Sequence, residues 1–341
     1  MKLMKTEDAV GQVLCHDITQ IIPGVKKGPV FKKGHVITPE DVPVLLSVGK
    51  DHIYIWENDE NHLHENDAAE ILRQLCQNEY MSASKPSEGK IELTAQVDGL
   101  FLVDTERLFR LNRLGEVMVA CRHGGFAVKK GDKLAGMRVI PLVIETAKMD
   151  AARAAVGTEP LFRLVPFREL KVGVVTTGNE VFYGRIQDSF TPVIEQKLAE
   201  YGCRMAWHTV LNDDHEKITA AANEMLREGA DMVLCTGGMS VDPDDKTPRA
   251  IKDTGADIVS YGAPVLPGAM FLLGYFADGT PILGLPGCVM YAKATVFDLV
   301  LPRIAAGVTV SRTDLKALGH GGLCLSCPEC HYPNCTFGKG A

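Results

Sequence analysis

The sequence predicts an α/β protein whose centre, residues 171–306, is a three-layer domain with a mostly parallel sheet. In this part, the apolar runs 172–177, 203–210 and 231–236 alternate with segments of helical periodicity. Such alternation is typical of a parallel sheet that is covered by helices on both faces. The first and third runs also lack polar alternation, as expected for strands that are buried on both faces.

Two smaller regions are expected before this domain. Residues 1–85 combine short apolar runs with two helical patterns, one beginning at Thr38-Pro39 and one over 67–79, and therefore predict an α+β region. The segment SASKPSEG, residues 82–89, has the composition of a linker. Residues 90–146 alternate apolar runs with glycine turns and predict a β-rich region, which a helix over 146–157 connects to the central domain.

Composition and charge limit the possible partners. The chain has 341 residues and a net charge of −7, whereas nucleic acids and anionic membranes are bound by a basic face. We therefore expect neither as a partner. The sequence has no apolar run long enough to span a membrane and no apolar signal segment near its N-terminus, so a cytoplasmic location is expected.

The segment TGGMSVDPDDKTP, residues 236–248, is the most informative loop. Gly237 and Gly238 directly follow a buried strand, so their N–H groups can face a ligand without interference from a Cβ atom. Thr247 is expected to cap a helix that points back at this loop. Between them lie the carboxylates of Asp242, Asp244 and Asp245, which suit a divalent cation bound to phosphate. Taken alone, the loop is equally consistent with a solvated turn.

Three further loops follow strands of the same predicted sheet. TTGNEV places Glu180 after the first strand, VLNDD places Asp213 after the second, and LGLPGC ends a later strand with a glycine- and proline-containing turn. Ligands of open α/β sheets bind beyond the carboxyl ends of the strands. The four loops together therefore favour one site for an anionic ligand.

These motifs, T-G-x-E, D-D, T-G-G-x-S-x-x-x-x-D and G-L-P-G in this order, resemble the molybdopterin-binding domain. That domain is found in molybdopterin molybdenumtransferases and molybdopterin adenylyltransferases, and the resemblance covers roughly residues 171–306. It implies catalytic roles for Glu180, Asp213 and Asp245, the last at the position that the family treats as catalytic. It also implies that the pterin and its phosphate contact Thr177, Gly178, Gly237, Gly238, Ser240, Asp242, Pro286 and Gly287.

The reaction implied by the resemblance belongs to molybdenum cofactor biosynthesis. Adenylylated molybdopterin is hydrolysed at its pyrophosphate, molybdate enters the dithiolene, and AMP leaves with the help of Mg²⁺, which neutralises charge on phosphoryl oxygens. The substrates would be a small pterin and molybdate. A molybdoenzyme or a second copy of this chain is the expected protein partner.

Two alternatives remain open. One is an adenylyltransferase, although such chains are usually a single short domain. The other is a non-catalytic carrier or sensor of molybdopterin, which three departures from the family pattern support. Asn179 replaces an acid, Ala269 replaces a lysine, and Cys288 replaces an asparagine. Loss of the lysine in particular weakens the attraction of an anion.

The C-terminal segment, residues 320–341, concentrates four cysteines in the spacing C-x₂-C-x₂-C-x₄-C. Four thiolates so close together suit Zn²⁺ or an iron–sulfur cluster. The predicted metal ligands are Cys324, Cys327, Cys330 and Cys335. The alternative is a disordered tail that is prone to oxidation. The other six cysteines are scattered, and we expect them to be reduced and buried.

Overall fold

The computed structural model describes residues 2–22, 26–55, 61–240, 242 and 245–340. The chain divides into two compact units. The first comprises residues 1–96, 103–122 and 131–163, and the second comprises residues 97–102, 123–130 and 164–341. Within the described ranges, no helix is both long and apolar enough to cross a membrane.

The N-terminal part of the first unit has two small antiparallel pairs of strands and one helix. Strand β1 (Lys2–Lys5) pairs with β4 (His52–Ile55), and β2 (Ile18–Ile22) pairs with β3 (Lys26–Phe31). Helix α1 (Asp41–Ser47) begins three residues after the predicted Thr38. The reason is local: the Asp41 carboxylate accepts hydrogen bonds from the backbone N–H (2.8 Å) and hydroxyl (2.9 Å) of Thr38, which forms the turn before the helix.

The remainder of the first unit is a four-stranded antiparallel sheet with three helices. The sheet order is β6 (Met81–Ala83), β7 (Lys90–Ala95), β11 (Lys133–Val139) and β9 (Val117–Cys121). The predicted linker 82–89 connects β6 to its antiparallel neighbour β7 and therefore lies within this sheet. The helices are α2 (Glu65–Cys76), α3 (Thr105–Asn112) and α4 (Thr146–Val156). Two further short strands, β5 (His62–His64) and β12 (Val143–Glu145), form an antiparallel pair.

A six-stranded sheet is the centre of the second unit, and the unit confirms the predicted α/β class. Its order is β15 (Arg204–Leu211), β14 (Lys171–Thr177), β16 (Met232–Thr236), β19 (Pro281–Leu285), β18 (Leu272–Tyr275) and β17 (Asp257–Tyr261). The first four strands are parallel, whereas β18 and β17 are antiparallel to their neighbours. A small sheet of β10 (Phe126–Val128), β8 (Gly99–Val103) and β13 (Phe162–Pro166) accompanies it.

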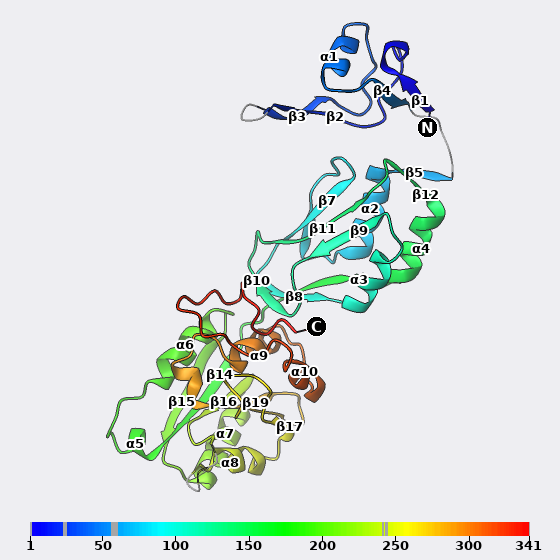
Figure 1. Ribbon diagram of the computed structural model, residues 1–341. Coiled ribbons are helices and arrows are strands. Elements are labelled where there is room, and N and C mark those ends of the chain that lie inside the picture. Colours follow the sequence, from blue (N-terminus) through cyan, green and yellow to red (C-terminus); the bar gives the residue numbers. More distant parts are fainter. Residues whose placement is uncertain (1, 23–25, 56–60, 241, 243–244, 341) are drawn as a thin grey trace. The chain divides into compact units, whose positions relative to one another are not determined.

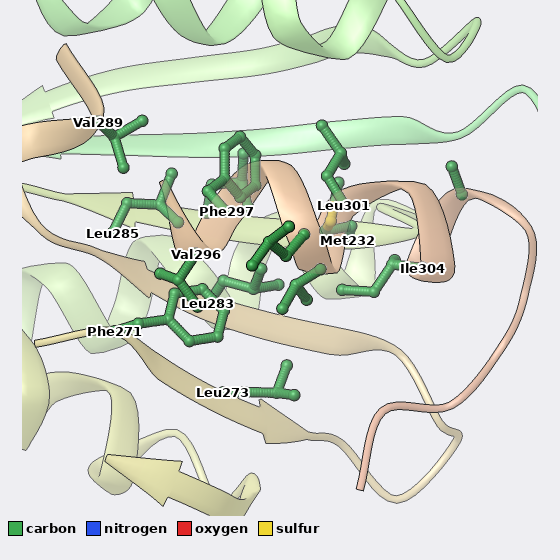
Figure 2. Packing of buried hydrophobic residues seen from close by; sticks show 14 of the residues in the cluster. Met232, Phe271, Leu273, Leu283, Leu285, Val289, Val296, Phe297, Leu301 and Ile304 are labelled. Atoms are coloured by element: carbon green, nitrogen blue, oxygen red, sulfur yellow. The ribbon is translucent and has the colours of Figure 1, made fainter. Parts of the chain in front are cut away.

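Helices cover both faces of the six-stranded sheet (Figure 1). Helices α7 (His215–Arg227) and α8 (Thr247–Asp253) pack on one face, and α6 (Phe190–Ala199) and α9 (Val296–Ala305) pack on the other. Figure 2 shows Phe297 and Leu301 of α9 beside Leu283 and Leu285 of β19. A nearly buried ion pair between Lys197 and Asp298, each 10% exposed, also joins α6 to α9.

Strand register brings the chemistry-bearing loops to one edge of this sheet. Thr177 pairs with Leu211, and Thr236 pairs with Leu285, each pair at the last residues of parallel strands. The loops that begin at 178, 212, 237 and 286 therefore start side by side. Short helices continue two of them, namely α5 (Asn179–Phe182) and the 3₁₀ helix η2 (Gly287–Met290).

Candidate functional site

The Gly-Gly loop packs tightly on the end of β14. A Cβ atom built on Gly237 would lie only 2.1 Å from the carbonyl oxygen of Thr177, and Gly237 has a φ of +84°. Both the close approach and the left-handed backbone require glycine at this position. Gly238 follows with a φ of +52°, so two successive residues turn the chain sharply away from the strand.

Two buried threonine hydroxyls join this loop to α8. The hydroxyl oxygens of Thr177 and Thr247 lie 3.2 Å apart, and the N–H of Thr247 donates a hydrogen bond to the carbonyl of Gly238 at 3.3 Å. Thr247 was expected at the N-cap of the helix, but the residue at the N-cap is Lys246. The expectation was wrong because the hydroxyl of Thr247 is engaged with Thr177 instead of capping its own helix.

Asp213 connects three of the four loops. Its Oδ2 atom accepts a hydrogen bond from the backbone N–H of Asn179 at 3.1 Å, and its Oδ1 atom would lie 3.7 Å from a Cβ built on Gly238. The adjacent Asp214 has a different role. It caps α7 by accepting hydrogen bonds from the N–H groups of Glu216 (3.1 Å) and Lys217 (3.4 Å), and the bond from Lys217 lowers the pKa of Asp214.

Asp242 and Asp245 hold the acidic loop in a closed turn. The N–H of Asp242 donates to Oδ2 of Asp245 at 3.1 Å, and the N–H of Asp245 donates to the carbonyl of Asp242 at 3.0 Å. Asp242 and Ser240 are exposed, and Asp245 is partly buried. Asp244, the third carboxylate of the sequence motif, lies outside the described residues.

Tyr261, which sequence reasoning missed, supports the same loop. The Tyr261 hydroxyl donates a hydrogen bond to the carbonyl of Met239 at 3.0 Å and lies 3.5 Å from that of Ser240. Burial raises the pKa of Tyr261, and the negative charge of Asp245 raises it further, so the hydroxyl stays protonated as a donor. No motif signals Tyr261, because it comes from the antiparallel strand β17.

Glu180 lies at the same edge but is exposed, in α5. Its carboxylate folds back toward Gly178, since a Cβ built on Gly178 would lie 2.9 Å from Oε1 of Glu180. The described residues contain no group of three or more His, Cys, Asp or Glu side chains placed to hold a metal ion. Glu180, Asp213 and Asp245 therefore share one edge of the sheet without converging on a single point.

The second glycine loop follows β19. Pro286 is buried and its carbonyl accepts a hydrogen bond from the N–H of Val289 at 3.0 Å, which closes the η2 turn. Gly287 is exposed, and a Cβ built on it would meet nothing within 4 Å. There is thus open space beside Gly287, next to the Gly-Gly loop. Cys288 is partly buried, and burial raises the pKa of its thiol.

A histidine that the motifs do not single out lies on the α6 face of the sheet. Nε2 of His208 lies 3.1 Å from the hydroxyl oxygens of both Thr176 and Thr191. Asp188 accepts hydrogen bonds from the N–H and the hydroxyl of Thr191, and these bonds stabilise the first turn of α6. This network connects the end of β14 to the loop that precedes α6.

Two buried polar atoms at these strand ends lack a hydrogen-bond partner among the described residues. They are the hydroxyl oxygen of Thr236 and Oδ1 of Asn212. Each lies directly before a glycine or an acid of the candidate site. Buried polar atoms are nearly always paired in native proteins. The unpaired ones are consistent with an edge that is completed by water or a ligand.

The four tail cysteines differ in burial. Cys324 and Cys335 are partly buried against the core of the second unit, whereas Cys327 and Cys330 are exposed. Because the described residues hold no group of three or more ligand side chains in place, the predicted tail site is not preassembled. Of the six scattered cysteines, Cys121 and Cys288 are partly buried, and the remainder are buried, as expected: Cys15, Cys76, Cys203 and Cys235.

Comparison with protein families identifies two segments. Residues 173–306 match a family described as a probable molybdopterin binding domain. Residues 3–57 match a family described as a domain of unknown function. The first match coincides with the α/β segment that carries all four loops.

Curated relatives and solved structures are similar to parts of the chain. A molybdopterin molybdenumtransferase of Synechococcus elongatus is 25% identical over 196 residues, which are 54% of this chain and 46% of the relative. One of Staphylococcus epidermidis is 25% identical over 298 residues, which are 82% of this chain and 65% of the relative. The crystal structure of the molybdopterin biosynthesis enzyme MoaB from Thermus thermophilus matches 39% of this chain and 91% of its own, with 25% identity and a TM-score of 0.33.

Proposed function

We propose that this chain, whose residues 173–306 belong to the molybdopterin-binding domain family, acts in molybdenum cofactor biosynthesis as a molybdopterin molybdenumtransferase. In the proposed reaction, molybdate enters the dithiolene of adenylylated molybdopterin and AMP is released. The observation that carries the proposal is the meeting of three loops at Asp213, which touches the Asn179 backbone and faces Gly238.

The chain's own groups suit a phosphorylated pterin. Gly237 and Gly238 have no side chains, and Gly237 packs directly against the carbonyl group of Thr177. N–H groups of such a loop can donate to phosphate oxygens. The open space beside Gly287 adds room for the second part of a long ligand. Fixed donors reduce the entropy that binding costs.

The donor set of the acidic loop fits Mg²⁺, which usually takes one or two protein carboxylates together with substrate phosphates. Asp245, with Asp242 beside it, would hold Mg²⁺, and the ion would neutralise charge on the phosphoryl oxygens. Asp245 is held in place by the N–H of Asp242, and the loop is held by the hydroxyl of Tyr261. These contacts position the carboxylate before any ligand arrives.

The departures from the family pattern affect the proposal differently. Asn179 contacts Asp213 through its backbone N–H, so the change from an acid to asparagine leaves that contact intact. Ala269, in contrast, removes a cation, and this favours the alternative of a molybdopterin carrier. An adenylyltransferase is the second alternative within the same family.

Two incubations separate these functions. In the first, the purified 341-residue chain is incubated with adenylylated molybdopterin, Mg²⁺ and molybdate, and the AMP formed is measured by chromatography. A molybdenumtransferase forms AMP only when molybdate is present. A carrier binds the pterin without AMP release. The second incubation contains ATP, Mg²⁺ and unmodified molybdopterin, and only an adenylyltransferase consumes ATP in it. Tight binding of the adenylylated pterin without molybdate-dependent AMP release would exclude the proposed activity.

A further inference from the structure

The C-terminal tail is fixed to the second unit by specific contacts. The backbone N–H of Cys324 donates to the carbonyl of Leu266 at 2.8 Å, and the N–H of Leu266 donates to the carbonyl of Gly322 at 2.8 Å. Further along, the Tyr332 hydroxyl donates to the carbonyl of Asp298 in α9 at 2.9 Å, and Phe337 is 2% exposed. The tail, red in Figure 1, thus lies against α9 as an ordered segment.

All four tail cysteines line one cavity of about 560 Å³. The tail forms one side of this cavity, and Leu266, Pro267 and residues 291–294 form the other. His331 also contributes to the lining. The remaining cysteines of the chain do not contribute.

The contacts of the tail hold the outer cysteines and leave the inner ones exposed. Cys324 is held beside Leu266 by a backbone hydrogen bond, and Cys335 lies in the sequence between the partly buried Tyr332 and the buried Phe337. Cys327 and Cys330 project from the segment between these fixed points and have no buried surroundings. Because exposed thiols do not stabilise the fold by packing, we attribute a chemical role to Cys327 and Cys330.

We propose that Cys324, Cys327, Cys330 and Cys335 bind a metal centre through four thiolates at this cavity. The shared ligand chemistry is tetrathiolate coordination, which both Zn²⁺ and iron–sulfur clusters use. Each thiol that becomes a ligand loses its proton to the solvent as the metal–sulfur bond forms. Cys324 and Cys335 provide the fixed half of the site, and Cys327 and Cys330 close over the metal.

The cavity also adjoins the second glycine loop, so that metal binding would affect this loop. Its wall at residues 291–294 directly follows η2, the turn of the second glycine loop, and the N–H of Ala292 donates to the carbonyl of Cys288 at 2.9 Å. Metal binding therefore stiffens a segment that is continuous with this loop. This consequence concerns the backbone alone and does not depend on the proposed enzymatic activity.

The test uses the whole 341-residue chain, purified without oxygen. Metal and acid-labile sulfide are measured per chain for the wild type, for the double variant Cys327→Ser/Cys330→Ser, and for Cys121→Ser as a control. Cys121 is also partly solvent-accessible but lies in the first unit. We expect about one metal centre per chain in the wild type and in the control, and none in the double variant. Zinc without sulfide identifies a single ion, and iron with sulfide identifies a cluster.

A second measurement guards against variants that fold poorly. Co²⁺ is added to metal-free wild-type protein, and the sulfur-to-metal charge-transfer bands report how many thiolates coordinate it. Hydrogen exchange is then compared with and without Co²⁺. We expect bands of four thiolates and slower exchange at the amides of Leu266 and of residues 291–294. Metal-free wild-type protein that also shows no thiolate bands with Co²⁺, or a double variant that keeps the metal, would overturn the proposal.

Discussion

Oδ2 of Asp213 accepts a hydrogen bond from the backbone N–H of Asn179 at 3.1 Å, and this contact joins the loops after two neighbouring parallel strands. The bond involves a charged acceptor and a backbone donor, a combination that is about twice as strong as a neutral pair. The bond uses the side chain of Asp213 but only the backbone of Asn179. The adjacent Asp214, with the same side chain, serves only its own helix.

This division of roles predicts different effects of two neighbouring substitutions. Asp213→Ala should weaken binding of adenylylated molybdopterin roughly tenfold or more, because a hydrogen bond to a charged group contributes about 1.5–3 kcal/mol and the first loop loses its tie. Asp214→Ala should lower the melting temperature through loss of the α7 cap and leave ligand affinity nearly unchanged. Equilibrium binding and thermal unfolding of both variants check this. Equal loss of affinity in the two would contradict the assignment.

Because the Gly-Gly loop lies so close to β14, one added methyl group at Gly237 should reduce both stability and pterin binding. Gly237→Ala places a Cβ against the Thr177 carbonyl, so the loop must move. Gly255→Ala is the matched control, since Gly255 has a φ of +87° but nothing within 4 Å of a built Cβ.

The control should cost about 1 kcal/mol in the free energy of unfolding, the penalty of the left-handed backbone alone. Gly237→Ala should cost more and should also abolish pterin binding. Urea unfolding with a binding assay measures both effects. If the two variants lose the same stability and both still bind, the packing of the loop has no role in the site.

The sequence was sufficient to place the four loops at one edge of the sheet because the motifs lie at strand ends. The apolar runs of β14 and β16 predict buried strands, and the carboxyl ends of parallel strands must share an edge, so the loops at Gly178 and Gly237 were placed correctly. The fold class follows from the same alternation of strands and helices.

Contacts that depend on tertiary structure could not be predicted. Tyr261 contacts the Gly-Gly loop from the antiparallel strand β17, and His208 of β15 contacts Thr191 of α6, so neither shares a motif with its partner. Threonine is a common N-cap residue, but the hydroxyl of Thr247 contacts that of Thr177 instead of capping α8. Local propensity determines which residues can cap a helix, and packing decides which of them do.

The hydroxyl of Tyr261 predicts a modest, specific effect on affinity. Tyr261→Phe removes one neutral hydrogen bond to Met239, which contributes about 0.5–1.5 kcal/mol, so the dissociation constant should rise by a factor between about 2 and about 12. Tyr275→Phe is the control, because the Tyr275 hydroxyl accepts a hydrogen bond from the N–H of Val310, outside the candidate loops. Both variants should lose a little stability. A control that loses as much affinity as Tyr261→Phe would show that the effect is not local.

Substitutions of Asp245 can separate the effect of its negative charge from the effect of the hydrogen bond that closes the loop. Its Oδ2 atom accepts from the N–H of Asp242, and an asparagine keeps an oxygen that can do the same without the negative charge. If Asp245 acts through Mg²⁺, both Asp245→Ala and Asp245→Asn should lose Mg²⁺-dependent AMP release by roughly a hundredfold, the effect of losing one strong electrostatic stabiliser. Both variants should still bind the pterin.

The matched control for this prediction is Asp253→Ala, an exposed acid at the end of α8 that pairs with Arg249 on the same helix. It should release AMP at the wild-type rate. AMP formed from adenylylated molybdopterin and molybdate is measured over a range of Mg²⁺ concentrations for all four proteins. An Asp245→Asn variant that keeps full activity while Asp245→Ala loses it would mean that the carboxylate only closes the turn, and the metal would then need other ligands at this edge.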